Sequence, residues 1–137
     1  MNSKQVGLTK DVGFQVGVRR TFNLTPEEAW EKLLSKKGKS IWLGKLISGD
    51  VSSDFGFRTK DGIEGKKRVF KPFSHFRIDY KKTEWTNQSM LQVRVIKMKD
   101  KTKATISFHQ EKLLDSNQRE EMKKHWEAVL AKVAEIK

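Results

Sequence analysis

The chain of 137 residues contains no cysteine. This absence excludes disulfide bonds, a catalytic thiol and any metal site with cysteine ligands. A chain of this length can nevertheless bury a substantial apolar core. We therefore expect one globular domain that is stabilised by its core.

Long apolar runs are also missing. No stretch is long enough to span a bilayer, and the first residues, MNSKQVGLTKDVGF, lack the apolar segment of a secretory signal peptide. We therefore expect no membrane insertion and a cytoplasmic location. Residues 1–12 are polar and without periodicity, which predicts a flexible tail. No repeat, low-complexity segment or linker divides residues 13–137, which are predicted to form a single domain.

Acidic residues are few beside the basic ones. The 29 Lys and Arg against 17 Asp and Glu give a formal net charge of +12. Such an excess favours encounters with acidic proteins, nucleic acid or anionic lipid. The basic residues are scattered, however, and no motif that reads nucleic acid accompanies them. We expect no specific nucleic-acid binding, and an acidic protein partner such as a chaperone stays open.

The two prolines lie at informative positions. Pro26 follows Thr25, and Glu28 comes three residues after that threonine, which together predict the start of a helix with a capping box. Gly38 is expected to close this helix in a left-handed conformation. Pro72 cannot donate a hydrogen bond to a sheet and is expected to end a strand that covers residues 63–71.

The last stretch, residues 116–137, predicts a long amphipathic helix. Asp115 is a good N-cap, and Gln118 can complete a capping box. Six apolar residues recur at helical spacing and would form one buried stripe, namely Met122, Trp126, Val129, Leu130, Val133 and Ile136.

The middle of the chain alternates between apolar and polar residues, as half-buried strands do. Residues 13–22, 76–80, 91–95 and 104–108 show this alternation, and short polar turns such as Asp61-Gly62 separate the strands. The pattern predicts an α+β fold in which an antiparallel sheet of about six to seven strands is covered by the C-terminal helix, with one or two short helices after the first strand.

This order of elements resembles the helix-grip fold of the SRPBCC (START-like) superfamily. The local match is to the bacterial branch related to the activator of the heat-shock-protein-90 ATPase. It is carried by residues 13–22 (GFQVGVRRTF), 41–44 (IWLG), 61–65 (DGIEG), 85–96 (WTNQSMLQVRVI), 106–113 (ISFHQEKL) and 119–130 (REEMKKHWEAVL). The resemblance implies a curved sheet wrapped around the long helix, with a ligand-sized cavity between them.

The three histidines, His75, His109 and His125, do not have the spacing of a metal site. We expect no metal and no cofactor. His109 shares a strand face with Glu111 and is the one weak candidate for a general base. No nucleophile or paired carboxylate accompanies it, so an interior or rim histidine that holds a hydrogen bond is the favoured interpretation.

Large aromatic side chains are numerous for one sheet and helix. Most of them are expected to pack in the core, and some are expected to line a pocket because a curled sheet is not always filled at its mouth. Trp42, in a short segment between two glycines, is the candidate for that mouth. The candidate ligand-binding residues are Trp42, Phe57, Phe70, Phe76, Trp85, His109, Met122 and Trp126.

Three functions follow as hypotheses. The leading one is a non-enzymatic module that binds a small apolar or amphipathic ligand between the sheet and the C-terminal helix. The second is a chaperone-associated interaction domain in the stress response, whose basic surface meets an acidic partner. The third is an enzyme of the cyclase or hydrolase kind with His109 as its base, for which the sequence offers the least support.

Overall fold

The computed structural model describes residues 8–9 and 13–136. The elements, in chain order, are β1 (Leu8–Thr9), β2 (Gly13–Phe22), α1 (Pro26–Leu34), α2 (Lys36–Trp42), β3 (Leu46–Gly49), β4 (Phe57–Thr59), β5 (Ile63–Gly65), β6 (Lys67–Lys71), β7 (His75–Lys82), β8 (Ser89–Lys97), β9 (Ala104–Leu113) and α3 (Ser116–Val133). Of the predicted N-terminal tail, residues 8 and 9 form β1, and the remainder lies outside the described residues.

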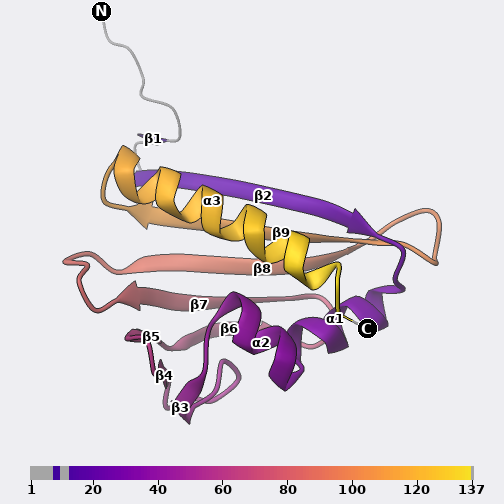
Figure 1. The fold of residues 1–137 in the computed structure, drawn as a ribbon, viewed down its shortest axis with the longest axis horizontal. Helices are drawn as coiled ribbons and strands as arrows, with labels where there is room; N and C mark the ends of the chain where they lie inside the picture. The colour runs from indigo at the N-terminus through magenta and orange to yellow at the C-terminus, as the bar shows by residue number, and fades with distance from the viewer. Residues whose placement is uncertain (1–7, 10–12, 137) are drawn as a thin grey trace, which may run out of the picture.

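All the strands join in one antiparallel sheet of order β1-β2-β9-β8-β7-β5-β4-β3, and β6 pairs with β7 beside this path. The long helix α3 crosses one face of the sheet over β2 and β9, and α1 and α2 cover the rest of that face (Figure 1). The predicted α+β helix-grip architecture is confirmed. The strand count exceeds the expected six to seven because several strands have only two to five residues.

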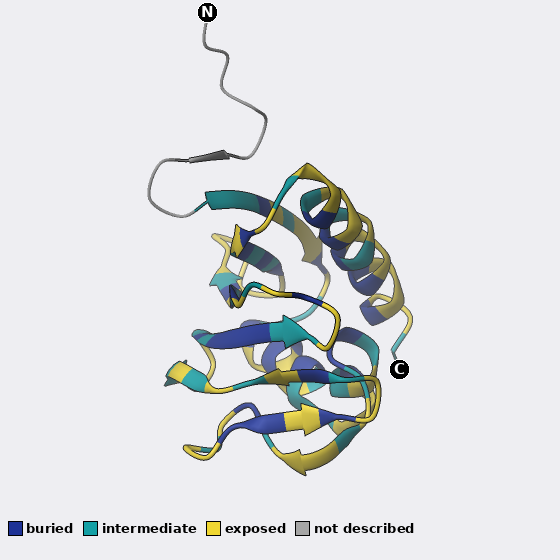
Figure 2. Ribbon diagram, turned by 90° about the vertical axis from the view of Figure 1, so that its left-hand side faces the viewer, coloured by how far each residue is buried: buried dark blue, intermediate teal, exposed yellow. Residues whose placement is uncertain are grey.

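The core lies between the sheet and the three helices. Figure 2 shows the buried side of α3 turned toward the strands and its exposed side turned outward. In α3 the buried apolar residues are Met122, Trp126, Val129, Leu130 and Val133, as the stripe predicts, whereas Ile136 lies beyond the end of the helix.

The first helix begins as predicted. The hydroxyl of Thr25 accepts from the Glu28 amide at 3.1 Å, and the Glu28 carboxylate accepts from the Thr25 amide at 2.9 Å. The prediction that Gly38 closes this helix is wrong. Helix α1 ends at Leu34, and Gly38 lies inside α2, where a Cβ atom would stand 1.8 Å from the Lys32 carbonyl oxygen. Glycine is needed there for the close approach of two helices.

The N-cap of α3 is confirmed, since Asp115 accepts from the Gln118 amide at 2.9 Å. The rest of the predicted capping box does not form. The Gln118 carboxamide instead accepts from the Leu114 amide at 3.0 Å and exchanges hydrogen bonds with Asn87. This contact ties the start of α3 to the turn between β7 and β8.

The strand predicted over residues 63–71 is divided. Segment β5 pairs with the end of β7 and β6 with its beginning, and β6 stops at Lys71, directly before Pro72. Among the residues that the structure describes, no helix is long and apolar enough to cross a membrane.

Candidate functional site

A cleft of about 300 Å³ opens where the end of α2, strands β5 and β7, and helix α3 meet. Its volume is at the lower limit of ligand pockets. Ten residues line it, namely Ser40, Ile41, Leu43, Gly44, Asp61, Ile63, Tyr80, Lys82, Glu84 and His125. The lining is mixed, with aliphatic side chains from α2 and β5 and polar groups from β7 and α3. Such a cleft suits an amphipathic molecule.

Tyr80 forms the inner wall of this cleft. It is an inward-facing residue of β7 with no exposed surface, and its ring contacts Trp85 and Trp126. Its hydroxyl group has no hydrogen-bond partner among the described residues. Burial raises the pKa of this hydroxyl far above its usual value, and Glu121 and Glu84 raise it further, so the group stays neutral.

An unpartnered buried hydroxyl is costly, because the group has lost its water and gained nothing in return. The backbone carbonyl of the same residue is satisfied, since the Ser89 hydroxyl donates to it at 2.6 Å. The core thus supplies partners for the main chain of Tyr80 and none for its side chain. The residue that carries this hydroxyl is one of those that line the cleft.

His125 forms the α3 side of the cleft. Its ring stands edge-on to Trp126 at 4.5 Å between centroids, and Nε2 lies 3.4 Å from the Trp42 carbonyl oxygen, which is long for a hydrogen bond. Burial lowers the pKa of this imidazole, and the weak contact with Trp42 only partly opposes that shift. The side chain is therefore neutral at pH 7 and loosely held.

Charged residues form the rim. Lys82 makes a 2.6 Å ion pair with Glu121 and lies 5.8 Å from the ring centroid of Trp85. Asp61 and Glu84 add two carboxylates at the opening. The interior is therefore neutral and the entrance is charged.

The residues predicted from sequence do not line this cleft. Trp42, Phe76, Met122 and Trp126 have no exposed surface and pack in the centre of the core. The sequence predicted Trp42 at a pocket mouth, and that prediction is wrong. The indole N–H of Trp42 donates to the Leu33 carbonyl at 2.9 Å, and its ring contacts Phe76. The space beneath the middle of α3 is filled by these rings.

The other predicted residues lie at the margins. Phe70 stacks on Phe76 at the edge of the core, and Trp85 is buried beside Tyr80. Phe57 is buried as well and borders a separate hollow near Arg68 and Asp79. Of the candidate set, Trp126 and Trp85 stand directly behind the cleft, through their contacts with Tyr80.

His109 is on the wrong side of the sheet for the proposed catalytic role. It pairs across the sheet with Gly17 and Gln92, on the face opposite the buried Phe108 and Gln110. Its Nε2 lies 2.9 Å from the Gln15 carboxamide oxygen. His109 therefore does not face the space between the sheet and α3, and its ring is hydrogen-bonded to Gln15 on the other face of the sheet. Within residues 8–9 and 13–136, no group of three His, Asp or Glu side chains could hold a metal ion.

The sequence matches no known family model and no curated protein. Solved structures with the same architecture exist. CalU16 of Micromonospora echinospora superposes with a TM-score of 0.75 at 14% identity, over 88% of this chain and 71% of that one. The chain shares the fold of CalU16 and has the helix-grip architecture expected from the sequence.

Two further solved structures share this fold. DynU16, a protein of the dynemicin biosynthetic locus, has a TM-score of 0.75 at 13% identity, and the match covers 88% of this chain but 46% of DynU16. PFC0360w of Plasmodium falciparum, an HSP90 activator, has a TM-score of 0.59 at 14% identity over 73% of this chain and 74% of that one. Identities this low establish the shared fold alone.

Tyr80 and His125 were visible in the sequence as an inward strand residue and a neighbour of the helical stripe. Neither carried a signal of its own. Alternation places Tyr80 inside, but only the packed structure shows that its hydroxyl lacks a partner. The site depends on which polar group the core leaves unsatisfied, and that is a property of tertiary packing.

Proposed function

We propose that the protein is a small-molecule binding module whose ligand occupies the cleft beside Tyr80 and His125. The observation that carries the proposal is the buried Tyr80 hydroxyl without a partner at the cleft wall. A ligand with a hydrogen-bonding group would satisfy it, while the apolar part of the ligand would lie against Leu43 and Ile63. The loosely held His125 ring is the side chain that moves to admit that group.

The support from other proteins is limited to the fold. DynU16, a protein of similar architecture, is encoded in the dynemicin biosynthetic locus. The filled centre beneath α3 restricts the ligand to the margin of the sheet. We therefore expect one that is small, or one that inserts only its end.

The test is a titration with a panel of phenols and medium-chain fatty acids, in which the quenching of tryptophan fluorescence measures binding. Trp85 and Trp126 both contact Tyr80 and would report binding. Tyr80→Phe should weaken the best ligand by about three- to tenfold, the loss of one hydrogen bond. The same substitution should raise the free energy of unfolding of the free protein by about 1–3 kcal/mol, because it removes an unsatisfied buried group.

Ser89→Ala is the matched control in the same core. The Ser89 hydroxyl donates to the Tyr80 carbonyl and accepts from the Gln110 amide at 2.8 Å, so its removal should lower stability and leave the affinity unchanged. If Tyr80→Phe instead destabilises the protein and binds every ligand like the wild type, the hydroxyl is structural and the proposal is rejected.

A protein-interaction role is a second candidate function. It is favoured by the net charge of +12 and by the fold shared with an HSP90 activator. A chaperone of the heat-shock-protein-90 type would then be the acidic partner. A pull-down with the purified protein at low ionic strength should recover such a chaperone and lose it at high salt. Failure to recover any at low salt would exclude this partner.

A further inference from the structure

Strand β3 ends the sheet and has a free edge. It pairs with β4 alone among the described strands, through Leu46, Ser48 and Gly49. Residues 47–49 are exposed, and the side chain of Ile47 is 59% accessible. An open edge presents main-chain N–H and C=O groups that can pair with another extended segment.

A groove lined by lysines runs beside this edge. It measures about 750 Å³ and lies between α2 and the start of β3. The residues that line it are Lys36, Lys37, Lys39, Ser40, Gly44, Lys45 and Leu46, and none of them is acidic. Lys36, Lys37 and Lys45 are exposed. The groove therefore combines a strong positive charge with a backbone edge.

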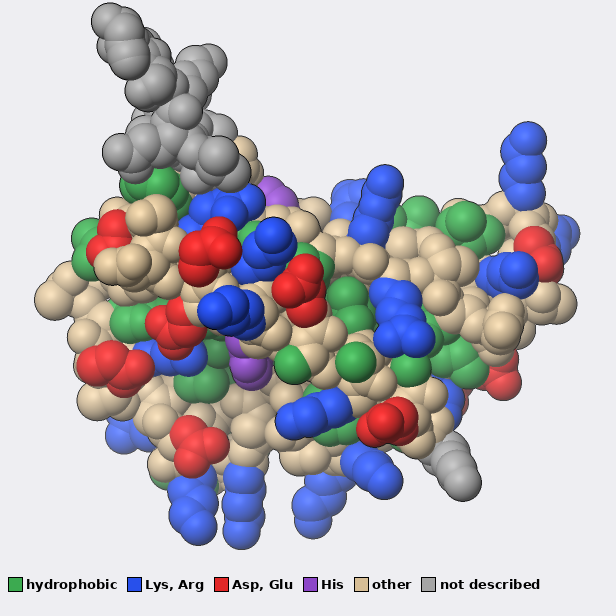
Figure 3. All heavy atoms as spheres, turned by 45° about the horizontal axis from the view of Figure 1, so that its top comes forward, with side chains coloured by type: hydrophobic (Ala, Val, Ile, Leu, Met, Phe, Trp, Pro, Cys, Tyr) green, Lys and Arg blue, Asp and Glu red, His purple; other side chains and the backbone are tan. Residues whose placement is uncertain are grey.

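The charge of this groove is poorly neutralised by the rest of the fold. Lys39 forms a 2.9 Å ion pair with Asp50, but Lys36, Lys37 and Lys45 have no such pair within the described part of the chain. Elsewhere Lys67, Arg68 and Lys82 pair with carboxylates. Acidic and basic side chains alternate on the long-helix face in Figure 3, whereas Lys and Arg predominate along its lower edge. Uncompensated positive charge of this kind attracts a negatively charged partner.

We propose that β3 accepts an extended, acidic segment of a partner protein as an added strand, whose carboxylates lie in the lysine groove. Alternate residues of a strand point to the same side, so an acidic residue at every second position would face the lysines. The backbone hydrogen bonds would supply affinity and the lysines selectivity. This inference rests on the protein-interaction role proposed above and assigns it to the β3 edge; the groove adjoins the ligand cleft, with which it shares Ser40 and Gly44.

The lysines also restrict which strands can pair with this edge. Lysine beside an edge strand repels basic strands, including a second copy of the same edge. An acidic strand turns that repulsion into attraction. A membrane or a nucleic acid would be attracted by the positive charge but could not form strand-like hydrogen bonds with the backbone of β3. A peptide can make both interactions, so a peptide is the partner that we propose.

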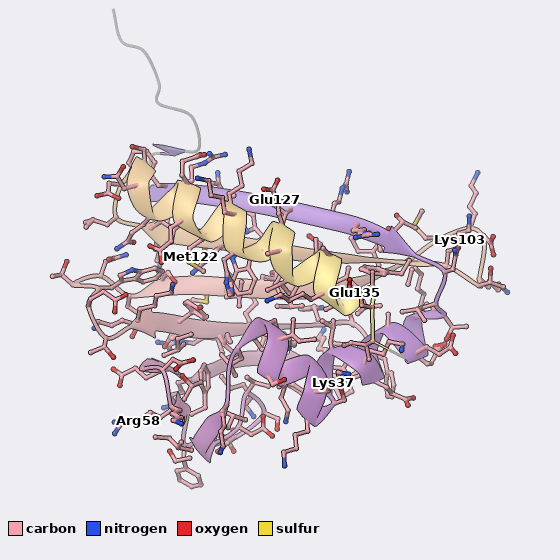
Figure 4. The ribbon with its side chains drawn as sticks, viewed as in Figure 1. Lys37, Arg58, Lys103, Met122, Glu127 and Glu135 are labelled. Atoms are coloured by element: carbon pink, nitrogen blue, oxygen red, sulfur yellow. The ribbon has the colours of Figure 1, made fainter. Side chains whose placement is uncertain are left out.

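The test measures fluorescence anisotropy of a labelled eight-residue peptide of alternating Glu and Val. The triple variant K36E/K37E/K45E should bind at least about tenfold more weakly, because attraction at close range becomes repulsion. The matched control is K99E/K101E/K103E, which changes the net charge equally, from +12 to +6 by three replacements of two units each. Its lysines are exposed in the β8–β9 turn, and Figure 4 shows Lys103 there, well apart from Lys37 on α2. The affinity of the control variant for the peptide should fall by no more than about twofold, because its altered charges act only through the long-range electrostatic field of the protein.

A second probe isolates the backbone contribution. The same peptide with alternate amides N-methylated keeps its charge and loses strand donors, and it should bind at least about tenfold more weakly. Equal affinity for the two peptides, or equal loss in both triple variants, would overturn the inference. Tighter binding to phosphatidylserine vesicles or to single-stranded DNA than to the peptide would also overturn it. None of the three substituted lysines lines the Tyr80 cleft, so titrating the groove variants with an uncharged phenol separates a failure of this inference from a failure of the ligand proposal.

Discussion

Individual buried polar groups in this core fall into two kinds. The indole N–H of Trp126 donates to the Gln110 carboxamide at 2.8 Å, Gln110 donates to Ser89, and Ser89 donates to the Tyr80 carbonyl. This chain satisfies each of its members inside an apolar core, as buried polar networks require. The Tyr80 hydroxyl stands a side chain's length away from that carbonyl and has no such partner. The satisfied polar groups stabilise the core, and the Tyr80 hydroxyl is the group on which the proposed ligand site rests.

Trp42 and Trp126 are equivalent in burial, which leads to a prediction about stability. Both have no exposed surface, and each indole N–H is hydrogen-bonded. Trp42→Ala and Trp126→Ala should each lower the free energy of unfolding by about 3–5 kcal/mol, through lost burial and the cavity left behind. Urea titrations at fixed pH measure both losses.

Phe55→Ala is the control for those two variants. The side chain of Phe55 is 99% exposed, so its removal should change the free energy of unfolding by less than about 0.5 kcal/mol. A Trp42→Ala variant as stable as the control would contradict the buried placement of Trp42.

At the scale of elements, the joint between α1 and α2 is a close connection. Ser35 serves both helices, because its hydroxyl donates to the Lys32 carbonyl at 2.7 Å and accepts from the Gly38 amide at 3.0 Å. Three residues later the backbone of α2 passes so close to the end of α1 that only a hydrogen fits at Gly38. The joint fixes Trp42, and with it the α2 side of the cleft.

Gly38→Ala should therefore destabilise the protein by about 1–3 kcal/mol, since the added methyl group forces the two helices apart. Gly17→Ala is the matched control, because a Cβ there would meet its nearest neighbour, a ring carbon of His109, at an ordinary 3.5 Å. The control should be neutral or slightly stabilising, by up to about 1 kcal/mol. Thermal melts of both variants test the difference, and equal melting temperatures would show that the joint can open without cost.

For the whole molecule, two histidines with lowered pKa values, His125 and His75, contribute to the dependence of stability on pH. Burial lowers the pKa of His125, and burial together with Arg94, Lys71 and Arg77 lowers that of His75. In the unfolded chain both imidazoles are protonated as the pH falls through about 6.5, whereas in the folded protein they are protonated only at lower pH. The unfolded state thus holds more protons in this range, and stability decreases as the pH falls.

The urea midpoint should therefore be lower at pH 5.5 than at pH 7.5, and the difference should shrink in His125→Gln and shrink further when His75→Gln is added. Carboxylates with lowered pKa values, such as those of Asp54 and Asp100, titrate at more acid pH and do not contribute in this window. A midpoint that rises on acidification to pH 5.5 would contradict the assignment.

The sequence by itself determined the elements and their order. The stripe of α3, the Thr25 capping box and the alternation along β7, β8 and β9 are local patterns whose causes lie within a few residues, so they can be read without coordinates. The alternation and stripe also identified Phe76, Met122 and Trp126 as inward-facing. The N-terminal boundaries of α1 and α3 were correct for the same reason.

Only the tertiary structure decided what those inward residues do. Whether an aromatic ring fills the core or lines a cavity depends on the side chains opposite it, which come from strands and helices far away in sequence. Gly38 shows the same limit, since its signal was real but its cause was the approach of Lys32 rather than a helix end. The cleft and the environment of the Tyr80 hydroxyl arise where elements far apart in the sequence meet, and contact between distant segments cannot be inferred from local pattern.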